Sequence, residues 1–507
     1  MDRASKSSLA TPVALGVLAA LAASVSAPNA AQAGVIKGPH LQDLRQDGIT
    51  ILWEQENAGA GTVTIDNNAL PSSSQLIHEV VVTNLSPATT YNYTVEADGE
   101  TYNGSFTTAP SVPLSPITFA VMGDNRTDHT AHQTMVGALS AEPPLALLMN
   151  TGDMVSSGEV AADWQSFFDV EHPFILNTPW YPTIGNHEED GGNLPHFYTD
   201  YLAPPTTTSG KEEYYSFTYA NTAFIVLDGH VKVDDLIIYT NFDATQLGWI
   251  DSMLAQYSAD PNIQHIFVFN HEPPYSSKDG RAGSRAMRFL FPKFLQYGVD
   301  AVISGHDHYL ERGESLGANP GVRYWIMGGG GAPLYDNESV GDLGHKPATF
   351  LGWFEDEHNV SFAMKDRGYM IVSVCNGQVD TAVKDSQGNV VDSLSWNTGD
   401  VAPGGCEGTG TGGAGGAGTG GAGASGGSGG AGTGAEAGFG GTGGTTSTSS
   451  GMTSTSSGAD PGTTEDDSGC GCTVAGRRSS SLPLGLASLL ALVGGWVGRR
   501  RTRLHPS

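Results

Sequence analysis

The sequence predicts an α/β body built from βαβ units, preceded by a small all-β sandwich. Two observations support this prediction. Residues 34–112 contain short segments of alternating apolar and polar residues separated by turn signals, which is typical of half-buried strands. Between residues 113 and 400, five short apolar segments each lead into Gly, Asp, Asn or His. Continuous apolar runs indicate strands that are buried on both faces, as in layered α/β folds.

Composition divides the chain into segments of different kinds. It has 507 residues, of which 69 are Gly, and only 15% are charged, compared with about 25% in ordinary globular domains. Both values indicate a low-complexity segment beside a globular part. The net charge of -29 would repel a phosphate backbone, which argues against nucleic-acid binding. Four cysteines exclude a disulfide-rich scaffold, and a bond between Cys375 and Cys406 is left open.

Residues 1–33 have the pattern of an export signal. Arg3 and Lys6 supply the positive start, Thr11–Val25 supplies the apolar run, and Ala31-Gln32-Ala33 supplies a small-x-small cleavage site. A buried N-terminal helix is less compatible with this segment, because the run has no polar face. We therefore expect an exported protein whose mature chain begins at Gly34.

The C-terminal end predicts a tether and a sorting tail. Residues 401–469 are rich in Gly, Ser and Thr and have few apolar side chains, so we expect a disordered linker. Residues 470–507 contain Cys470-Gly471-Cys472, the apolar run Ser481–Val497 and the cluster Arg499-Arg500-Arg501. The run is slightly shorter than the about 20 residues of a membrane-spanning helix, and the arginines fit its cytoplasmic side.

This tail resembles the MYXO-CTERM type of bacterial sorting signal. The resemblance implies processing by a sorting protease and a protein that is associated with the cell surface or outer membrane, or released from it. The alternative is a plain C-terminal membrane anchor. Under either interpretation, the chain contacts a membrane only through residues 470–507.

Residues 34–112 resemble a fibronectin type III-like domain. Strands are expected at Ile49–Trp53, Thr62–Ile65 and Tyr91–Val95, the last ending at an Asp98-Gly99 hairpin turn. Leu85–Tyr91 looks like the tyrosine corner of immunoglobulin-like sandwiches, and Trp53 would be the core tryptophan. We expect a packing or spacer module here in preference to a ligand-binding domain.

The five apolar segments of the central region predict a metal site. They are Ile117–Met122 before Gly123-Asp124, Leu145–Met149 before Gly152-Asp153, Tyr181–Ile184 before Gly185-Asn186-His187-Glu188, Ile266–Phe269 before Asn270-His271, and Ala301–Ser304 before Gly305-His306-Asp307-His308. Ligands of layered α/β folds gather at the carboxyl ends of strands. One such turn is weak evidence, but five that all end in oxygen or imidazole ligands indicate a shared site.

The donor atoms indicate the class of metal. Two carboxylates, one amide oxygen and three imidazoles are too many for one tetrahedral ion and suit two ions that share a carboxylate. Mixed nitrogen and oxygen donors favour Fe, Zn or Mn. No cysteine lies in these motifs, which excludes a thiolate zinc site.

In order and spacing, the motifs resemble those of the calcineurin-like metallophosphoesterases and, among them, the purple acid phosphatases. Pro273-Pro274-Tyr275 and His308–Arg312 also look like the surroundings of the last two motifs. The resemblance implies a two-sheet layered sandwich and two metal ions. It assigns Asp124 and His308 to the first metal, Asp153 to both, Asn186, His271 and His306 to the second, and His187 to the substrate.

One position departs from that family. Ser156 stands where purple acid phosphatases have the tyrosine whose phenolate binds Fe(III) and gives the colour. Arg126 stands where other metallophosphoesterases have a histidine. The first metal has therefore lost one ligand, for which Asp128, His129, His132 or water could substitute. The resemblance consequently leaves Fe(III) open, and we expect two divalent ions and no purple colour.

These observations predict an exported, surface-tethered phosphatase that hydrolyses small phosphate monoesters by attack of a metal-bound hydroxide. His187 would be the general acid. Glu188 would either orient His187 or cap a turn. Arg126 would either clamp the phosphate or form a surface salt bridge. The alternatives are a phosphodiesterase acting on nucleotides or glycerophospho-compounds, and a surface adhesion protein with a vestigial enzyme domain.

Three further features are expected to be structural. Gly328–Gly331 follows an apolar strand but lacks the Lys-Ser/Thr ending of a phosphate-binding loop, so it predicts a tight crossing beside the site. His230 and His358 are expected to be surface or core residues.

Overall fold

The computed structural model describes residues 34–113, 115–189, 195–230, 242–278, 283–316, 321–335, 344–350 and 353–398. The chain divides into the units Met1–Ala414 and Gly415–Ser507, and every described residue belongs to the first. The expected export signal, linker and sorting tail lie outside the described residues. Within the described ranges, no helix has both the length and the apolar character needed to cross a membrane.

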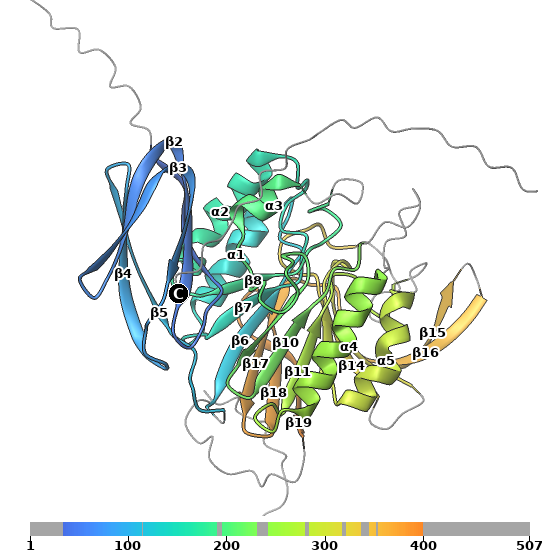
Figure 1. Cartoon of the computed structure of the whole chain (residues 1–507). Helices are drawn as coiled ribbons and strands as arrows, with labels where there is room; N and C mark the ends of the chain where they lie inside the picture. Colours follow the sequence, from blue (N-terminus) through green and yellow to red (C-terminus); the bar gives the residue numbers. More distant parts are fainter. Residues whose placement is uncertain are drawn as a thin grey trace, which may run out of the picture. The chain divides into compact units, whose positions relative to one another are not determined.

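Five antiparallel strands form the N-terminal sheet (Figure 1): β1 (Val35–Gln42), β2 (Ile49–Ile65), β3 (Asn68–Val82), β4 (Thr90–Ala97) and β5 (Glu100–Thr107). Strands β4 and β5 are joined by Asp98 and Gly99, which have φ values of 48° and 80°. Positive φ at both central residues is the requirement of a tight hairpin turn, so the predicted hairpin is confirmed.

One prediction for this sheet was wrong, because Ile49–Trp53 and Thr62–Ile65 belong to a single strand, β2. Its register against β3 shifts twice, between Glu54 and Gly59 and between Gly59 and Gly61. A side chain at Gly61 would overlap the Trp53 ring, so the glycine lets the strand pass over the tryptophan. The first half of β2 pairs with β1 and the second half with β4.

The Tyr91 phenol ties the turn before β4 to the sheet. The backbone N–H of Ser86 donates a hydrogen bond of 2.8 Å to the Tyr91 hydroxyl, which is the kind of contact that Leu85–Tyr91 predicted. Trp53 is 1% exposed, and its ring stacks on His78 at 4.3 Å. The aromatic residue that the sequence placed in the core is therefore buried.

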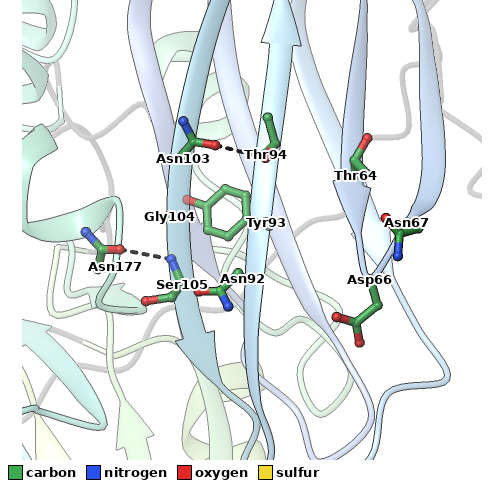
Figure 2. A pocket seen from close by; sticks show the side chains of 10 residues that line it. All are labelled: Thr64, Asp66, Asn67, Asn92, Tyr93, Thr94, Asn103, Gly104, Ser105 and Asn177. Atoms are coloured by element: carbon green, nitrogen blue, oxygen red, sulfur yellow. Dashed lines mark hydrogen bonds between the residues drawn. The ribbon is translucent and has the colours of Figure 1, made fainter.

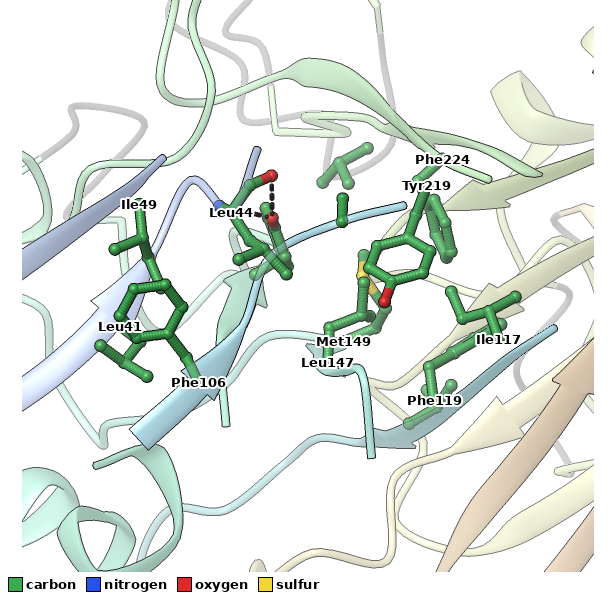
Figure 3. Packing of buried hydrophobic residues seen from close by; sticks show 14 of the residues in the cluster. Leu41, Leu44, Ile49, Phe106, Ile117, Phe119, Leu147, Met149, Tyr219 and Phe224 are labelled. Carbon is green, nitrogen blue, oxygen red and sulfur yellow. Dashed lines mark hydrogen bonds between the residues drawn. The ribbon is translucent and has the colours of Figure 1, made fainter. Parts of the chain in front are cut away.

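The N-terminal sheet packs directly against the rest of the described chain. The Tyr93 hydroxyl donates to the Leu176 carbonyl at 2.7 Å, and the Leu44 N–H donates to the Tyr181 hydroxyl at 2.9 Å. One continuous apolar cluster links the two parts (Figure 3); it includes Leu41, Leu44, Ile49, Phe106, Ile117, Phe119, Leu147 and Met149. Apolar burial of this kind favours a fixed contact over a loose linker between the two parts.

The body contains two further sheets. The six-stranded sheet has the order β19 (Val390–Asn397), β18 (Gln378–Asp385), β17 (Gly368–Cys375), β6 (Ile117–Met122), β7 (Leu147–Asn150) and β8 (Trp180–Pro182). The eight-stranded sheet has the order β15 (Gly344–Phe350), β16 (Trp353–Met364), β13 (Leu310–Ser315), β14 (Arg323–Met327), β12 (Ala301–Ser304), β11 (His265–Phe269), β10 (Thr222–Val226) and β9 (Tyr215–Tyr219).

Helices cover the outer faces of these two sheets. Helices α1 (His129–Ser140) and α2 (Ala161–Ile175) share an apolar cluster with β6–β8, and the short helix α3 (His196–Tyr201) joins it. Helices α4 (Ala244–Ala259) and α5 (Arg285–Tyr297) share another cluster with β10–β12. Between the sheets, Phe119 contacts Phe224 and Phe267 with ring centroids at 5.1 and 5.7 Å. The predicted two-sheet α/β body is present (Figure 1).

The five apolar segments that the sequence singled out are strands, namely β6, β7, β8, β11 and β12. The first three are mutually parallel, and β11 and β12 are parallel to each other. All residues of these strands are buried except Thr118, which is partly buried. Parallel pairing brings successive carboxyl ends of strands to the same edge, which is where the polar motifs follow.

Candidate metal centre

The backbone at three strand ends adopts a conformation that L-residues rarely use. Asp124, Asp153 and His306 have φ values of 56°, 54° and 68°. Each such residue costs of the order of 1–3 kcal/mol and persists only where the surroundings hold it. Here the Asp124 N–H donates to the Gly152 carbonyl at 2.8 Å, and the His306 N–H donates to Asp124 Oδ2 at 2.9 Å. The loops are therefore bonded to one another in a strained arrangement that concentrates polar side chains.

The glycines after β14 permit this close approach. The Gly330 N–H donates to the Gly123 carbonyl at 2.9 Å, and a Cβ at Gly330 would overlap that oxygen. A Cβ at Gly328 would overlap the Asp307 carbonyl. Gly328–Gly331 is thus a tight crossing beside the centre, as predicted.

Asp124, Asp153 and His308 form the first group of possible metal ligands. One ligand atom from each lies within 4.8 Å of the others, and all three residues are buried. His308 Nε2 is 3.5 Å from Asp124 Oδ1, while its Nδ1 is 2.8 Å from the Pro333 carbonyl. The carbonyl must accept from Nδ1–H, which fixes the tautomer that presents a lone pair on Nε2 toward the carboxylates.

Asn186, His271 and His306 form the second group. The Asn186 Oδ1 atom is 3.3 Å from His271 Nε2 and 3.0 Å from His306 Nδ1. His271 Nδ1 lies 2.8 Å from the Thr151 carbonyl and must donate to it, so His271 Nε2 faces the group. That same Nε2 is 3.2 Å from Asp153 Oδ1. Asp153 therefore touches both groups, and the structure brings all six residues together.

The charges in this cluster are deeply buried. Burial raises the pKa of Asp124 to about 8, and its Oδ1 has no hydrogen-bond partner among the described residues. Burial also opposes ionisation of Asp153, but the neighbouring His271 holds the pKa of Asp153 well below its usual range. Burial lowers the pKa of His308 to about 4, which keeps its ring neutral. Buried carboxylates beside a neutral imidazole form a donor set that fits cations.

Arg126 lies inside the cluster. Its Nε donates to Asp153 Oδ2 at 3.1 Å, and its Nη2 is 3.3 Å from His308 Nε2. The partner carboxylate is 1% exposed and the Arg126 side chain 17%, so this ion pair is not the surface salt bridge considered above. The guanidinium stands next to two residues of the first group, where it can reach an anion bound there.

His187 lies at the rim of the same cluster. Its Nδ1 is 2.8 Å from the Ser156 carbonyl and donates to it, and its Nε2 is 3.9 Å from Asp153 Oδ2. The side chain is 30% exposed. The ring is consequently oriented by backbone, with Nε2 directed toward the cluster and accessible to a ligand. The Ser156 side chain itself is exposed, and its hydroxyl lies 3.5 Å from that of Thr127.

Glu188 anchors the loops through hydrogen bonds to four backbone N–H groups. Its Oε2 accepts from the N–H groups of Asp153 and Gly185, both at 2.8 Å, and its Oε1 accepts from Met154 and Val155 at 2.8 and 3.2 Å. Burial raises the pKa of Glu188 to about 7. Of the two roles considered for Glu188, the structure therefore supports the turn-capping one.

The residues proposed to replace the missing ligand lie elsewhere. Asp128 caps helix α1, accepting from the Ala131 N–H at 3.0 Å, and His132 Nε2 is 2.8 Å from Glu171 Oε1. His129 is an exposed residue at the start of α1. Helix capping and packing thus account for Asp128 and His132, and neither one reaches the six-residue cluster.

Tyr335 is a functional candidate that the sequence did not reveal. Its ring stacks on His308 with centroids 4.7 Å apart, and its hydroxyl donates to the His306 carbonyl at 3.0 Å. Lys278 Nζ lies 3.3 Å from the centre of the same ring. No motif surrounds Tyr335, so only the folded chain shows that it supports both histidines of the last motif.

The remaining expectations have mixed outcomes. His358 is buried and stacks on Tyr275 at 4.5 Å, which confirms a core position. His230 is also buried, but it lies among carboxylates. Cys375 is disulfide-bonded, and Cys406, the partner that the sequence left open, lies outside the described residues.

A pocket on the N-terminal sheet does not resemble a catalytic site. Figure 2 shows that it is lined by residues of β4 and β5, by Thr64 of β2 with Asp66 and Asn67 in the turn after it, and by Asn177, whose Oδ1 accepts from the Ser105 N–H at 2.9 Å. Its lining includes one carboxylate, Asp66, and neither His nor Cys. The catalytic candidates are therefore those of the six-residue cluster.

Comparison with known proteins finds a family match over the part of the chain that holds the six-residue cluster. Residues 117–310 match the family described as Calcineurin-like phosphoesterase. An uncharacterised protein of Mycobacterium tuberculosis is 28% identical over 301 residues, covering 51% of this chain and 56% of the relative. Purple acid phosphatase 22 of Arabidopsis thaliana is 30% identical over 248 residues, covering 46% and 53%.

A solved structure shares the fold. The purple acid phosphatase PPD1 of yellow lupin (Lupinus luteus) superimposes with a TM-score of 0.55 at 18% identity, covering 71% of this chain and 74% of that one. The chain spans about half the length of the first curated relatives that it matches. Residues 117–310 therefore resemble the calcineurin-like phosphoesterases, and the relatives of this chain include purple acid phosphatases.

Proposed function

We propose that this chain, through its calcineurin-like phosphoesterase domain, is a hydrolase that cleaves small phosphate monoesters with two metal ions. The observation that carries the proposal is the position of Asp153 between the two ligand groups, 3.2 Å from His271 Nε2 and within 4.8 Å of ligand atoms of Asp124 and His308. A carboxylate in that position can serve two ions at once.

The donor set fits two divalent ions such as Zn, Mn or Fe. Asp124 and His308 would hold the first, Asn186, His271 and His306 the second, and Asp153 both. Two bound ions would supply the positive charge that phosphoryl transfer to water requires. A vestigial domain in a surface adhesion protein is less compatible with a complete cluster of six buried or partly buried donors.

Arg126 would bind the phosphate. Its guanidinium lies beside Asp153 and His308 and carries donors in the planar arrangement that matches two phosphate oxygens. A substrate phosphate would therefore exchange with the contacts that Arg126 makes in this structure. The guanidinium would then offset charge that the substrate brings into a buried, carboxylate-rich centre.

His187 would protonate the leaving alkoxide. Because Nδ1–H donates to the Ser156 carbonyl, a proton carried on Nε2 is directed toward the cluster. A positioned general acid of this type contributes about 10²–10⁴ in rate. The exposed rim position of the ring suits a group that must meet the departing half of a substrate and then exchange its proton with water.

The rest of the chain would serve location. We propose that residues 1–33 export the protein, that residues 34–112 form a fibronectin type III-like spacer, and that a sorting protease processes residues 470–507. The mature protein would then be held at the cell surface or outer membrane by the 401–469 linker, or released from it. Recovering Met1, or a main cytoplasmic pool, would contradict this part of the proposal.

One experiment tests the catalytic proposal. The purified mature chain is assayed with p-nitrophenyl phosphate and bis-p-nitrophenyl phosphate, together with metal analysis. We expect the monoester to be preferred, and Asp153→Ala to lose both ions of the six-residue cluster and activity. Asp47→Ala, whose native side chain is 67% exposed, is the control. Preference for the diester would indicate a phosphodiesterase, and full activity in Asp153→Ala would refute the two-metal proposal.

A further inference from the structure

A third group of possible ligands lies apart from the six-residue cluster. Ligand atoms of Glu189, Asp228 and His230 all lie within 4.8 Å of one another. Asp228 and His230 follow strand β10, and Glu189 follows the loop after β8. None of these residues belongs to the first or the second group described above, so the third group needs a separate explanation.

His230 is buried with both ring nitrogens facing carboxylates. Its side chain is 1% exposed, its Nδ1 is 3.7 Å from Asp228 Oδ1, and its Nε2 is in ion-pair contact with Glu272 Oε1. Nε2 is thus held by its ion pair with Glu272, whereas among the described residues His230 Nδ1 and Glu272 Oε2 form no hydrogen bond. Polar atoms buried in this way are costly unless a ligand satisfies them.

The surrounding structure holds this group in place. Gln246 accepts from the Asp228 N–H at 3.0 Å and donates to the Asp228 carbonyl at 2.8 Å. A Cβ at Gly229 would come within 2.9 Å of Asn270 Oδ1 and 3.0 Å of Glu272 Oε2, so glycine is what allows the turn to pack against these acceptors. The turn is therefore pre-organised by residues from α4 and from the segment after β11.

The group also carries more negative charge than it can neutralise. Three carboxylates share one imidazole. Burial, reinforced by the charge of Asp228, raises the pKa of Glu189 to about 8. Although burial opposes it, Glu272 and Asp228 hold the pKa of His230 well above its usual value. Both shifts have the sign expected of a buried site that attracts a cation.

We propose that Glu189, Asp228 and His230 bind a third divalent cation. On binding, His230 would release its Nδ1 proton to solvent and hold the cation through that nitrogen, while Nε2–H would donate to Glu272, which orients the ring as a carboxylate does behind many metal-bound histidines. Carboxylates combined with one imidazole suit Mn²⁺ or Zn²⁺. The His230 ring centre is 5.9 Å from that of His271, so this cation would lie beside the six-residue cluster without sharing a ligand with it.

The test is a count of ions in the mature chain. After removal of metal by a chelator, the protein is titrated with Mn²⁺, and separately with Zn²⁺. Bound metal is measured by elemental analysis after gel filtration, and Mn²⁺ also by electron paramagnetic resonance. We expect three ions per chain in the wild type and two in His230→Gln and Glu189→Gln. Glu159→Gln, an exposed acid, is the matched control and should keep three.

Further variants separate this proposal from the two-metal function. Asp153→Ala should lose the two ions of the six-residue cluster and retain one, whereas Glu272→Gln should retain all three sites but weaken the third by about 10–100-fold. If His230→Gln does not fold, the partly exposed Glu189→Gln supplies the same measurement. Two ions in the wild type with no loss in Glu189→Gln would overturn the third site and leave the two-metal proposal intact.

Discussion

Replacing Glu188 by glutamine should destabilise the protein more than a one-atom change suggests. Each carboxylate oxygen accepts from two backbone N–H groups: Oε2 from Asp153 and Gly185, and Oε1 from Met154 and Val155. A glutamine amide nitrogen cannot accept, so in either orientation two buried N–H groups lose their acceptor. At about 1–3 kcal/mol for each unsatisfied group, Glu188→Gln should lower the free energy of unfolding by about 2–6 kcal/mol.

The same change should weaken metal binding. In either orientation of the amide, one of the N–H groups that lose their acceptor belongs to Asp153 or to its neighbour Met154, so the loop that aims the shared carboxylate relaxes. Urea unfolding followed by tryptophan fluorescence measures the stability, and calorimetric titration of the metal-free protein measures the affinity. Glu159→Gln is again the control. A stability change within about 0.5 kcal/mol, the usual range for a surface substitution, would refute the anchoring role.

Three further outcomes are expected. His187→Ala should keep its metals, and its rate of hydrolysis of alkyl phosphates should fall by about 10²–10⁴-fold. The rate with p-nitrophenyl phosphate should fall less, because that leaving group needs little protonation. Equal losses on both substrates would reject the acid role. The wild-type protein should be colourless, and its phosphatase activity should have a pH optimum near or above neutral. Iron-loaded Ser156→Tyr should gain a visible absorption band if position 156 reaches the first metal. Because burial lowers the pKa of His40 to about 4, only the unfolded chain takes up a proton on this residue as the pH falls from about 6.5 to 4. His40 should therefore contribute a loss of about 3 kcal/mol in the free energy of unfolding over that range, and acid-denaturation curves of His40→Gln should lack this contribution.

Much of the candidate centre could be predicted from local patterns. A buried strand needs an uninterrupted apolar run, and a side chain that enters a shared site must follow the end of that run. Ile117–Met122 and Ala301–Ser304 therefore coincide with β6 and β12, and the polar residues that follow them lie in one cluster. The Asp98-Gly99 hairpin was predictable for a similar reason, because its backbone conformation depends on those two residues alone.

Other features depend on contacts between residues far apart in the chain. Asp128 and His132 have the chemistry of ligands, but helix α1 directs them to Ala131 and Glu171. Arg126 could have been a surface residue, and only the packing of the β6 loop against the loops after β7 and β12 places it on Asp153 and His308.

The sequence by itself thus determined the five strands that lead into the polar motifs, their polar ends and six candidate ligands, because each of these follows from the residues next to it. The tertiary structure decided that β2 is one bent strand, that Glu188 binds four backbone N–H groups, and that His230 lies between Asp228 and Glu272. The physical reason is that a buried polar atom takes whichever partner the fold brings within hydrogen-bond distance. Three of the four partners of Glu188 are 33 or more positions away in the chain, and Glu272, whose carboxylate is in ion-pair contact with His230 Nε2, is also distant from His230 in sequence.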